Sequence, residues 1–299
     1  MKWKDGQTSM ELELPAHFSF SEALIFLGRS SQEILHYVED SAVYKGIVFD
    51  GEVILLKISS TETHLHASFL LGAPSDNGRK KAAAFIEEWL DLKREAGGFA
   101  RMAAGDPLLE GLAERYAGLR IIGIPDLFEA LVWAVIGQQI NLTFAYKLKK
   151  AFTEKYGTCF PYGGQCFWLF PEPEKIAALE PEELKQLQFT GRKAEYIIGI
   201  AKLMAENKLR KDSLSGQPGA RDVLMSLKGV GAWTADYVRM KCLLDSAAFP
   251  IGDAGLQNAL KHQMGFDRKP SIEEIEKAAS RWDGWQAYAV FYLWRSLYE

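Results

Sequence analysis

The chain has 299 residues, 48% of them hydrophobic and 25% charged, with a formal net charge of −4. This composition is typical of a folded protein of about two domains. No stretch approaches the roughly 18 apolar residues of a membrane span, and the N-terminal residues contain no apolar run of a signal peptide. The sequence therefore argues against an integral membrane protein, and we expect a cytoplasmic one.

Three cysteines, Cys159, Cys166 and Cys242, occur outside any CxxC pair. So few cysteines, with no CxxC pair, indicate neither a disulfide framework nor a zinc site. Charge is unevenly distributed: residues 1–100 carry 10 basic and 15 acidic groups (net −5), whereas residues 101–299 carry 25 and 24 (net +1). A nearly neutral C-terminal part can still bind nucleic acid through backbone amides and a few placed cations.

Residues 10–70 are rich in β-branched, aromatic and alternating side chains, which predicts strands within 12–14, 34–37, 42–49, 53–59 and 64–71. Asp50-Gly51 separates two of these runs and predicts a tight hairpin turn. Helices at 20–27 and 79–93 would cover one face of the sheet. His64 and His66 share one face of a strand. We interpret them as surface histidines, with a metal-binding pair as the alternative.

A change of composition at 97–105 precedes a part of the chain that is almost entirely helical. Asp126 and Glu129 form a capping-box pattern, as do Ser271 and Glu274. Helices are predicted from Asp126 to about Gly137 and at 142–156, 174–179, 182–187, 192–206, 221–226, 254–264, 271–282 and 286–298. The fold class is therefore α+β, with an antiparallel sheet domain and flanking helices over residues 1–104 and an all-α domain over residues 105–299.

The segment LMSLKGVGAWTADYV, residues 224–238, has the pattern of a helix, a tight glycine turn and a second helix. Gly229 and Gly231 permit positive φ and a close approach of the backbone to a partner. The second helix begins at Gly231, and its unpaired N–H groups favour a phosphate beyond the turn. The alternative is an ordinary helical corner in which the glycines only turn the chain.

Asp253 follows the loop Phe-Pro-Ile-Gly and begins the helix predicted over 254–264. The N–H groups at a helix N-terminus favour the ionised form of an aspartate. Taken alone, however, an aspartate at a helix N-cap is more often structural than catalytic.

The pattern LxxLxGVGxxTA followed about twenty residues later by an aspartate resembles the helix-hairpin-helix-GPD superfamily of base-excision DNA glycosylases. Within it, the similarity is to the AlkA-type 3-methyladenine DNA glycosylases II. It extends upstream over residues 119–140 and downstream over residues 281–294. The resemblance implies an AlkA-like N-terminal sheet domain, a helical glycosylase domain and damaged double-stranded DNA as the partner. We expect a monomer, associated with the nucleoid if the organism is bacterial.

The resemblance also implies how the hairpin binds DNA. Residues expected to contact the DNA backbone at the turn are Lys228, Gly229, Val230, Gly231 and Thr234. Backbone carbonyls of Met225, Leu227 and Val230 are expected to hold an alkali metal ion, Na⁺ or K⁺. No other cofactor is required.

Gln138 and Gln139 end a predicted helix where the family places residues that enter the gap left in the DNA. The wedge of AlkA is a leucine, and the matching residue here is Gln139, so the sequence departs from the pattern at this position. The alternative is that both amides only solvate a helix terminus.

Trp233 and Tyr237 are one helical turn apart and share a face, and Trp294 matches a third aromatic residue of the family's base pocket. Stacked aromatic rings attract a cation such as a methylated purine by about 0.5–2 kcal/mol each. The alternative is that the three rings are part of the core. Ala254 replaces a tyrosine that follows the catalytic aspartate of AlkA, so the pocket shape differs.

Asp253 is the catalytic residue that the resemblance implies. Its carboxylate would stabilise the oxocarbenium character of the sugar as the base leaves, and would orient the attacking water. Bifunctional relatives carry a nucleophilic lysine where this chain has Trp233, so no lyase activity is expected. No cysteine follows Cys242, so an iron–sulfur cluster like that of endonuclease III is not expected.

The sequence therefore predicts a monofunctional glycosylase that excises alkylated purines of the 3-methyladenine type. Two alternatives remain at this stage. One is a glycosylase for an oxidised or deaminated base, suggested by Ala254 and Gln139. The other is a catalytically silent DNA-binding protein that uses the hairpin as a phosphate clamp.

Overall fold

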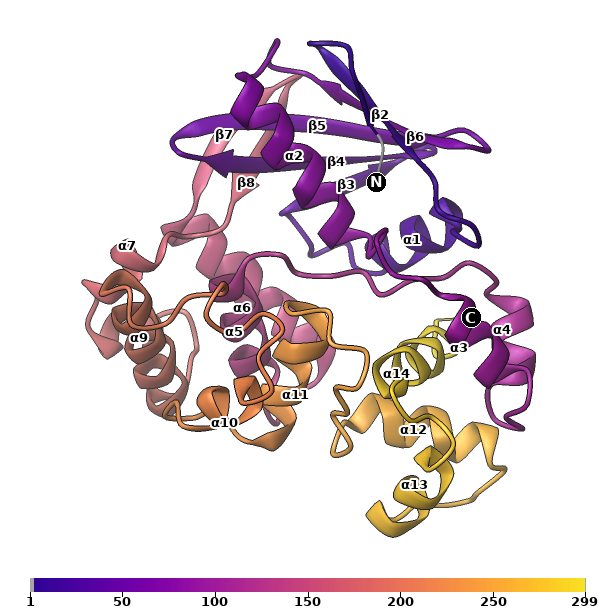
Figure 1. The fold of residues 1–299 in the computed structure, drawn as a ribbon. Helices are drawn as coiled ribbons and strands as arrows, with labels where there is room; N and C mark the ends of the chain where they lie inside the picture. Colours follow the sequence, from indigo (N-terminus) through magenta and orange to yellow (C-terminus); the bar gives the residue numbers. More distant parts are fainter. Residues whose placement is uncertain (1–2, 299) are drawn as a thin grey trace.

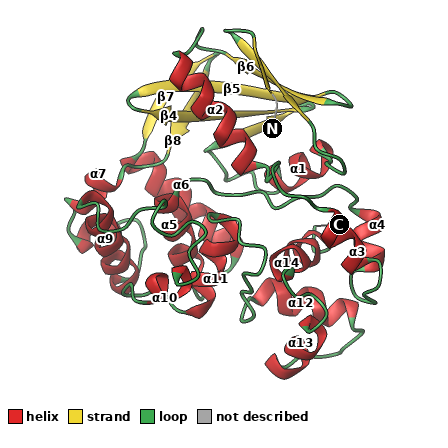
Figure 2. Cartoon of the chain, in the orientation of Figure 1, coloured by secondary structure: helices red, strands yellow, loops and turns green. Residues whose placement is uncertain are grey.

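The computed structural model describes residues 3–298, in which an antiparallel sheet and a larger set of helices pack together (Figure 1). Six strands form one sheet in the order β1-β2-β6-β5-β4-β3, with neighbours antiparallel throughout. The strands are β1 (Trp3–Asp5), β2 (Ser9–Glu13), β3 (His36–Glu39), β4 (Ala42–Phe49), β5 (Glu52–Ser60) and β6 (His64–Phe69). Figure 2 shows the strands gathered at one end of the molecule.

The sheet follows from the alternation in its sequence. In β6, Leu65, Ala67 and Phe69 are buried, whereas His64 and His66 are on the opposite face. His66 lies 3.4 Å from a carboxylate oxygen of Glu11, and the described residues contain no cluster of three or more His, Cys, Asp or Glu side chains suited to a metal.

The predicted hairpin turn lies between β4 and β5. Asp50 and Gly51 both have positive φ, 51° and 81°, as a type I′ turn requires. Helices α1 (Phe20–Leu27) and α2 (Asp76–Trp89) belong to the same region, and α2 crosses one face of the sheet (Figure 1).

The remaining helices lie within a few residues of the predicted ranges where a helix was predicted. They are α3 (Gly97–Ala103), α4 (Glu110–Arg115), α5 (Leu127–Gly137), α6 (Leu142–Tyr156), α7 (Pro173–Ala177), α8 (Pro181–Lys185), α9 (Gly191–Ala205), α10 (Ala220–Met225), α11 (Ala232–Lys241), α12 (Ala254–Gln263), α13 (Ile272–Ala279) and α14 (Gln286–Arg295). None of the described helices is long and apolar enough to span a membrane.

One capping box is present in full and the other only in half. Ser271 and Glu274 bond reciprocally at the start of α13. At the start of α5, Asp126 accepts from the backbone N–H of Glu129, but the Glu129 carboxylate accepts a hydrogen bond from Lys149 instead of returning to the cap. A long-range ion pair has replaced the local bond that the pattern predicted.

The helical part contains a β-hairpin that the sequence did not predict. Strands β7 (Thr158–Tyr162) and β8 (Gln165–Leu169) are joined by Gly163 and Gly164, both at positive φ. Their side chains reach the large sheet, where the Phe160 ring would collide with any Cβ at Gly46. The hairpin therefore ties the helical part to β4.

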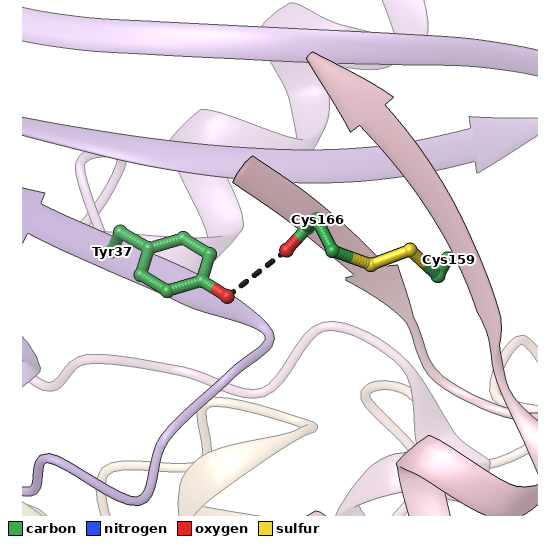
Figure 3. Close-up of a disulfide and its surroundings, with 3 residues drawn as sticks. All are labelled: Tyr37, Cys159 and Cys166. Atoms are coloured by element: carbon green, nitrogen blue, oxygen red, sulfur yellow. Dashed lines mark hydrogen bonds between the residues drawn. A yellow bond between two sulfur atoms is a disulfide. The ribbon is translucent and has the colours of Figure 1, made fainter. Parts of the chain in front are cut away.

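The expectation of no disulfide was wrong for this hairpin. Cys159 and Cys166 form one, with Cα atoms 5.8 Å apart, and the Tyr37 hydroxyl donates to the backbone carbonyl of Cys166 at 3.0 Å (Figure 3). Paired strands bring two cysteines seven residues apart into range, which a search for CxxC spacing does not detect. Cys242 is free and buried.

Helix α14 joins the two parts of the molecule. Phe291 packs on Phe26 of α1 with ring centroids 4.7 Å apart, and Arg295 donates to Glu22 at 2.7 Å. The segment expected to contain the domain boundary, 97–105, holds α3, whose Phe99 ring packs against the aromatic rings of α14. The boundary between residues 104 and 105 stays a prediction.

Candidate active site

The glycine turn between α10 and α11 takes the predicted form of a helical hairpin. Gly229 has φ +86°, and a Cβ built there would lie 2.2 Å from the Tyr196 ring. Both the backbone conformation and the space therefore require glycine at this position. Gly231 is the N-cap of α11 and is exposed, with no side chain capping the helix. The first N–H groups of α11 thus have no side-chain cap, and a phosphate would suit that place.

The two glutamines at the end of α5 differ in direction. Gln138 donates its side-chain N–H groups to the Gly229 carbonyl at 2.9 Å and to the Thr234 hydroxyl at 3.0 Å. These two bonds connect the end of α5 to the hairpin and stabilise the turn. Gln139 is exposed and has φ +56°, a conformation that is uncommon outside glycine. Of the two, Gln139 is the side chain available to a partner.

The other residues expected to contact DNA also separate by exposure. Lys228 is exposed, and its ammonium lies 3.0 Å from Glu195. Val230 and Thr234 are buried, 5% and 2% exposed. They hold the turn together, which leaves Lys228, Gln139 and the backbone at Gly231 on the surface.

The carbonyl groups named for an alkali ion lie around the same turn. The Leu227 carbonyl accepts from the Val230 N–H at 3.1 Å, whereas those of Met225 and Val230 accept no backbone hydrogen bond from the described residues. Carbonyl oxygens left without donors at a tight turn are suitable ligands for such an ion.

Asp253 is the N-cap of α12, and its carboxylate is held by three neutral donors. Oδ1 accepts from the Leu256 backbone N–H at 2.7 Å and from the Trp294 indole N–H at 2.7 Å. Oδ2 accepts from the Trp233 indole N–H at 3.1 Å. Among the described residues Asp253 takes part in no ion pair, and its side chain is half-buried.

The three aromatic residues predicted to form a base pocket lie together beside this carboxylate. Tyr237 is in the middle, with ring centroids 5.5 Å from Trp233 and 6.1 Å from Trp294. The ring planes are tilted by 34° and 36°, so Tyr237 contacts both other rings and the three form an aromatic cluster beside Asp253.

Sequence analysis missed the residue that holds Tyr237. The Trp133 indole N–H, on α5, donates to the Tyr237 hydroxyl at 2.8 Å. Burial raises the pKa of Tyr237, so the hydroxyl keeps its proton at neutral pH. Trp133 and Tyr237 are 104 residues apart, and no local pattern signals this contact.

Comparison of the sequence with known proteins identifies a family. Residues 132–283 match the model of the HhH-GPD superfamily of base excision DNA repair proteins, and residues 15–131 match that of the 8-oxoguanine DNA glycosylase N-terminal domain. The chain is 40% identical to a DNA-3-methyladenine glycosylase of Bacillus subtilis, each covered in full. It is 32% identical to a putative DNA-3-methyladenine glycosylase of the same organism, over 83% of this chain and 84% of that one.

A solved structure gives the same result for the fold. The 3-methyladenine DNA-glycosylase from Archaeoglobus fulgidus superposes with a TM-score of 0.80 at 25% identity, covering 95% of this chain and 97% of that one. The turn, the aspartate and the matches over both parts of the chain agree. The chain belongs to the HhH-GPD superfamily of base-excision DNA repair proteins.

Proposed function

We propose that the protein is a DNA glycosylase that removes alkylated purines of the 3-methyladenine type from double-stranded DNA, by hydrolysis supported by Asp253. The observation that carries this is the Asp253 carboxylate, bonded by the indole N–H groups of two of the three clustered aromatic residues. The relatives named as 3-methyladenine glycosylases support the alkylated substrate over an oxidised or deaminated one.

The chemistry needs the nucleotide outside the duplex, because the glycosidic bond is out of reach within the stack. The turn at Gly229–Gly231 would hold the backbone beside the lesion, and Gln139 would enter the gap. The base would then lie against the aromatic cluster of Trp233, Tyr237 and Trp294. A methylated purine is cationic, so aromatic faces favour it over a neutral base.

Asp253 would act on the sugar. As the bond to the base breaks, C1′ gains positive character, and a carboxylate close to it lowers the energy of that state. Indole and amide donors fix the carboxylate in place without neutralising it, so its charge stays available. The cationic base leaves without a strong general acid, and water attacks C1′ with Asp253 orienting it.

We infer that the enzyme has no lyase activity. Trp233 stands at the position of the Schiff-base lysine of bifunctional relatives, and its indole is bonded to Asp253. The nearby Lys228 points to Glu195 on the surface. Borohydride reduction during turnover should trap no covalent protein–DNA product; a trapped product would overturn this inference.

An alkali ion at the turn is a further part of the proposal. The carbonyls of Met225, Leu227 and Val230 would hold Na⁺ or K⁺ and stiffen the turn for phosphate. The enzyme would need no iron–sulfur cluster and would act as a monomer on DNA.

The decisive test is base release from methylated duplex DNA by the wild type and by Asp253→Asn. Release of 3-methyladenine by the wild type and its loss in the variant, with DNA affinity retained, is the expected result. DNA binding without release of any base would instead show a catalytically silent DNA-binding protein. A parallel assay on duplex DNA that contains 8-oxoguanine tests the other substrate class, and release from that duplex alone would show it.

A further inference from the structure

A buried ion triad connects the sheet domain with the helices that carry the base pocket. The Lys149 ammonium, on α6, lies 3.1 Å from Glu33 and 2.9 Å from Glu129. The three side chains are only 8%, 8% and 14% exposed. Glu33 comes from the loop between α1 and β3, and Glu129 from α5. Burying three charges costs free energy that this pairing must offset, which makes the triad weak evidence for stability alone.

The triad is in contact with the ring that holds Tyr237. The Lys149 ammonium lies 5.4 Å from the centre of the Trp133 ring, within range of a cation–π contact. The Trp133 ring also packs against Tyr146, with ring centroids 4.8 Å apart. Trp133 then donates its indole N–H to the Tyr237 hydroxyl at 2.8 Å. A continuous chain of contacts thus runs from Glu33 to Tyr237.

Packing alone does not fix the orientation of the side chains in this row of contacts. A cavity of about 60 Å³ is lined by Trp133, Tyr146, Lys149 and Tyr237, together with Glu33 and other residues of the sheet domain. Side chains beside a cavity lack neighbours on one side, so their orientation depends more on directed bonds. The bonds of Lys149 and Trp133 supply that direction.

We propose that Glu33 and Lys149 are positioning residues for base binding: acting through Trp133, they set the orientation of Tyr237 and so make the sheet domain part of base recognition. The inference rests on the proposed role of Tyr237 as a wall of the base pocket. Its consequence is that a change in the sheet domain alters the rate of excision but not the affinity for DNA, because the DNA backbone is bound by the glycine turn.

The size of the effect follows from geometry. A misplacement of about 1 Å at a reacting group costs up to roughly 100-fold in rate. Loss of one positioning bond to a ring that still packs should cost less, about tenfold. We therefore expect a fall in the single-turnover rate constant of excision and little change in the Kd for duplex DNA.

The experiment compares Lys149→Met, Lys149→Arg and Trp133→Phe in the full chain, on duplex DNA containing 3-methyladenine or 7-methylguanine. Trp133→Phe keeps an aromatic ring but removes the indole N–H donor together with part of the ring volume. We expect Lys149→Met and Trp133→Phe each to lower the single-turnover rate about tenfold and to leave Kd within twofold. Lys149→Arg should restore most of the rate, because it keeps the cation.

A double variant distinguishes positioning from loss of fold. Lys149→Met combined with Trp133→Phe should be no slower than Trp133→Phe alone, since both act on the same bond. Lys150→Met is the matched control, because Lys150 is the next residue of α6 and, among residues 3–298, its one ion pair is with Glu154 at 3.8 Å near the surface. It should leave rate and Kd unchanged.

Lys149→Met leaves two carboxylates without their cation and risks unfolding, so Glu33→Gln tests the same link with a smaller change. The amide oxygen can still accept from Lys149, but the amide NH2 then faces the N–H groups of Ile34 and Leu35. The variant should slow excision about threefold, and its thermal midpoint is measured alongside. Multiplying effects in the double variant, or rates that follow the thermal midpoint alone, would overturn the inference. If Tyr237→Ala excises at the wild-type rate, the base-pocket role of Tyr237 fails instead; if only Tyr237→Ala is slow, the positioning inference alone fails.

Discussion

Two groups of buried or half-buried carboxylates in this molecule are held in opposite ways. Asp253 is bonded by two indole N–H groups and one backbone N–H, all neutral. Glu33 and Glu129 share the ammonium of Lys149. Burial acts to raise the pKa of Glu33, but the Lys149 and His36 charges and the Leu35 backbone N–H together outweigh it and hold that pKa well below its usual range. Burial likewise opposes the charge of Lys149, and the two glutamates nevertheless raise its pKa.

The difference separates a reactive site from a structural one. A carboxylate paired with a lysine has little charge left to offer a third group, whereas one bonded by neutral donors remains an unneutralised anion. A sugar that becomes cationic needs the second kind. The structure places Asp253, the carboxylate proposed to react, among tryptophans and the domain-linking carboxylates around a cation.

Asp253→Asn should give the largest effect, because the amide fills the same space and carries no charge. We expect the single-turnover rate of base excision to fall about 1,000-fold, in line with the loss of one electrostatic group in other active sites. Rapid-quench measurement of base release checks this, with thermal midpoint and DNA affinity as controls. A fall of less than tenfold would show that the charge at 253 is not what the reaction uses.

The free energy of unfolding should depend on pH because His36, which lies beside Glu33 in the buried ion triad, titrates differently in the folded and unfolded chain. Burial lowers the pKa of His36 to about 4, against attraction by Glu33, and its ring N–H donates to the Leu27 carbonyl at 3.0 Å. The unfolded chain binds a proton near pH 6.5 and the folded chain near pH 4. The stabilisation is therefore complete above pH 6.5 and lost as pH falls towards 4.

The full shift corresponds to about 3 kcal/mol, and partial solvent contact of His36 reduces this to about 2 kcal/mol. Urea unfolding at pH 7 and at pH 4.5 measures the loss. His36→Gln keeps a donor for Leu27 and cannot be protonated, so its free energy of unfolding should change less over this range. An equal pH dependence in both proteins would assign the effect to other groups.

Trp294→Phe should have a smaller effect on the reaction. The variant keeps a ring beside Tyr237 and removes the 2.7 Å hydrogen bond to Asp253. A hydrogen bond to a charged group contributes about 1.5–3 kcal/mol, so excision should slow by about tenfold or more. Trp168→Phe, on β8, is the matched control. Equal rates in the two variants would mean that the indole N–H does not hold the carboxylate.

Lys228→Ala should give the smallest effect, since it alters neither group of carboxylates. Its ion pair with Glu195 is exposed and contributes little to stability. If Lys228 meets a DNA phosphate, the slope of log K against log salt should become shallower by about 1, with the excision rate constant unchanged. A titration of duplex affinity at several salt concentrations tests this, and an unchanged slope would remove Lys228 from the interface.

The local features of the fold were predictable because each depends on residues close in sequence. The Asp50-Gly51 turn, the helix N-cap at Asp253 and the glycine at 229 follow from permitted φ values and from donors left open at a helix end. The same physics indicated the hairpin and the aspartate, and the family resemblance then joined them into one site.

What only the tertiary structure decided are contacts between residues far apart in the chain. Three examples depend on which elements pack together. Gln138 bonds to the Gly229 carbonyl, two indole N–H groups bond to Asp253, and Glu129 pairs with Lys149 instead of capping its own helix. The disulfide of Cys159 and Cys166 depends on a hairpin that two adjacent glycines allow. Local steric rules fix turns and caps, whereas the partner of a buried polar group is set by the packing of the whole core.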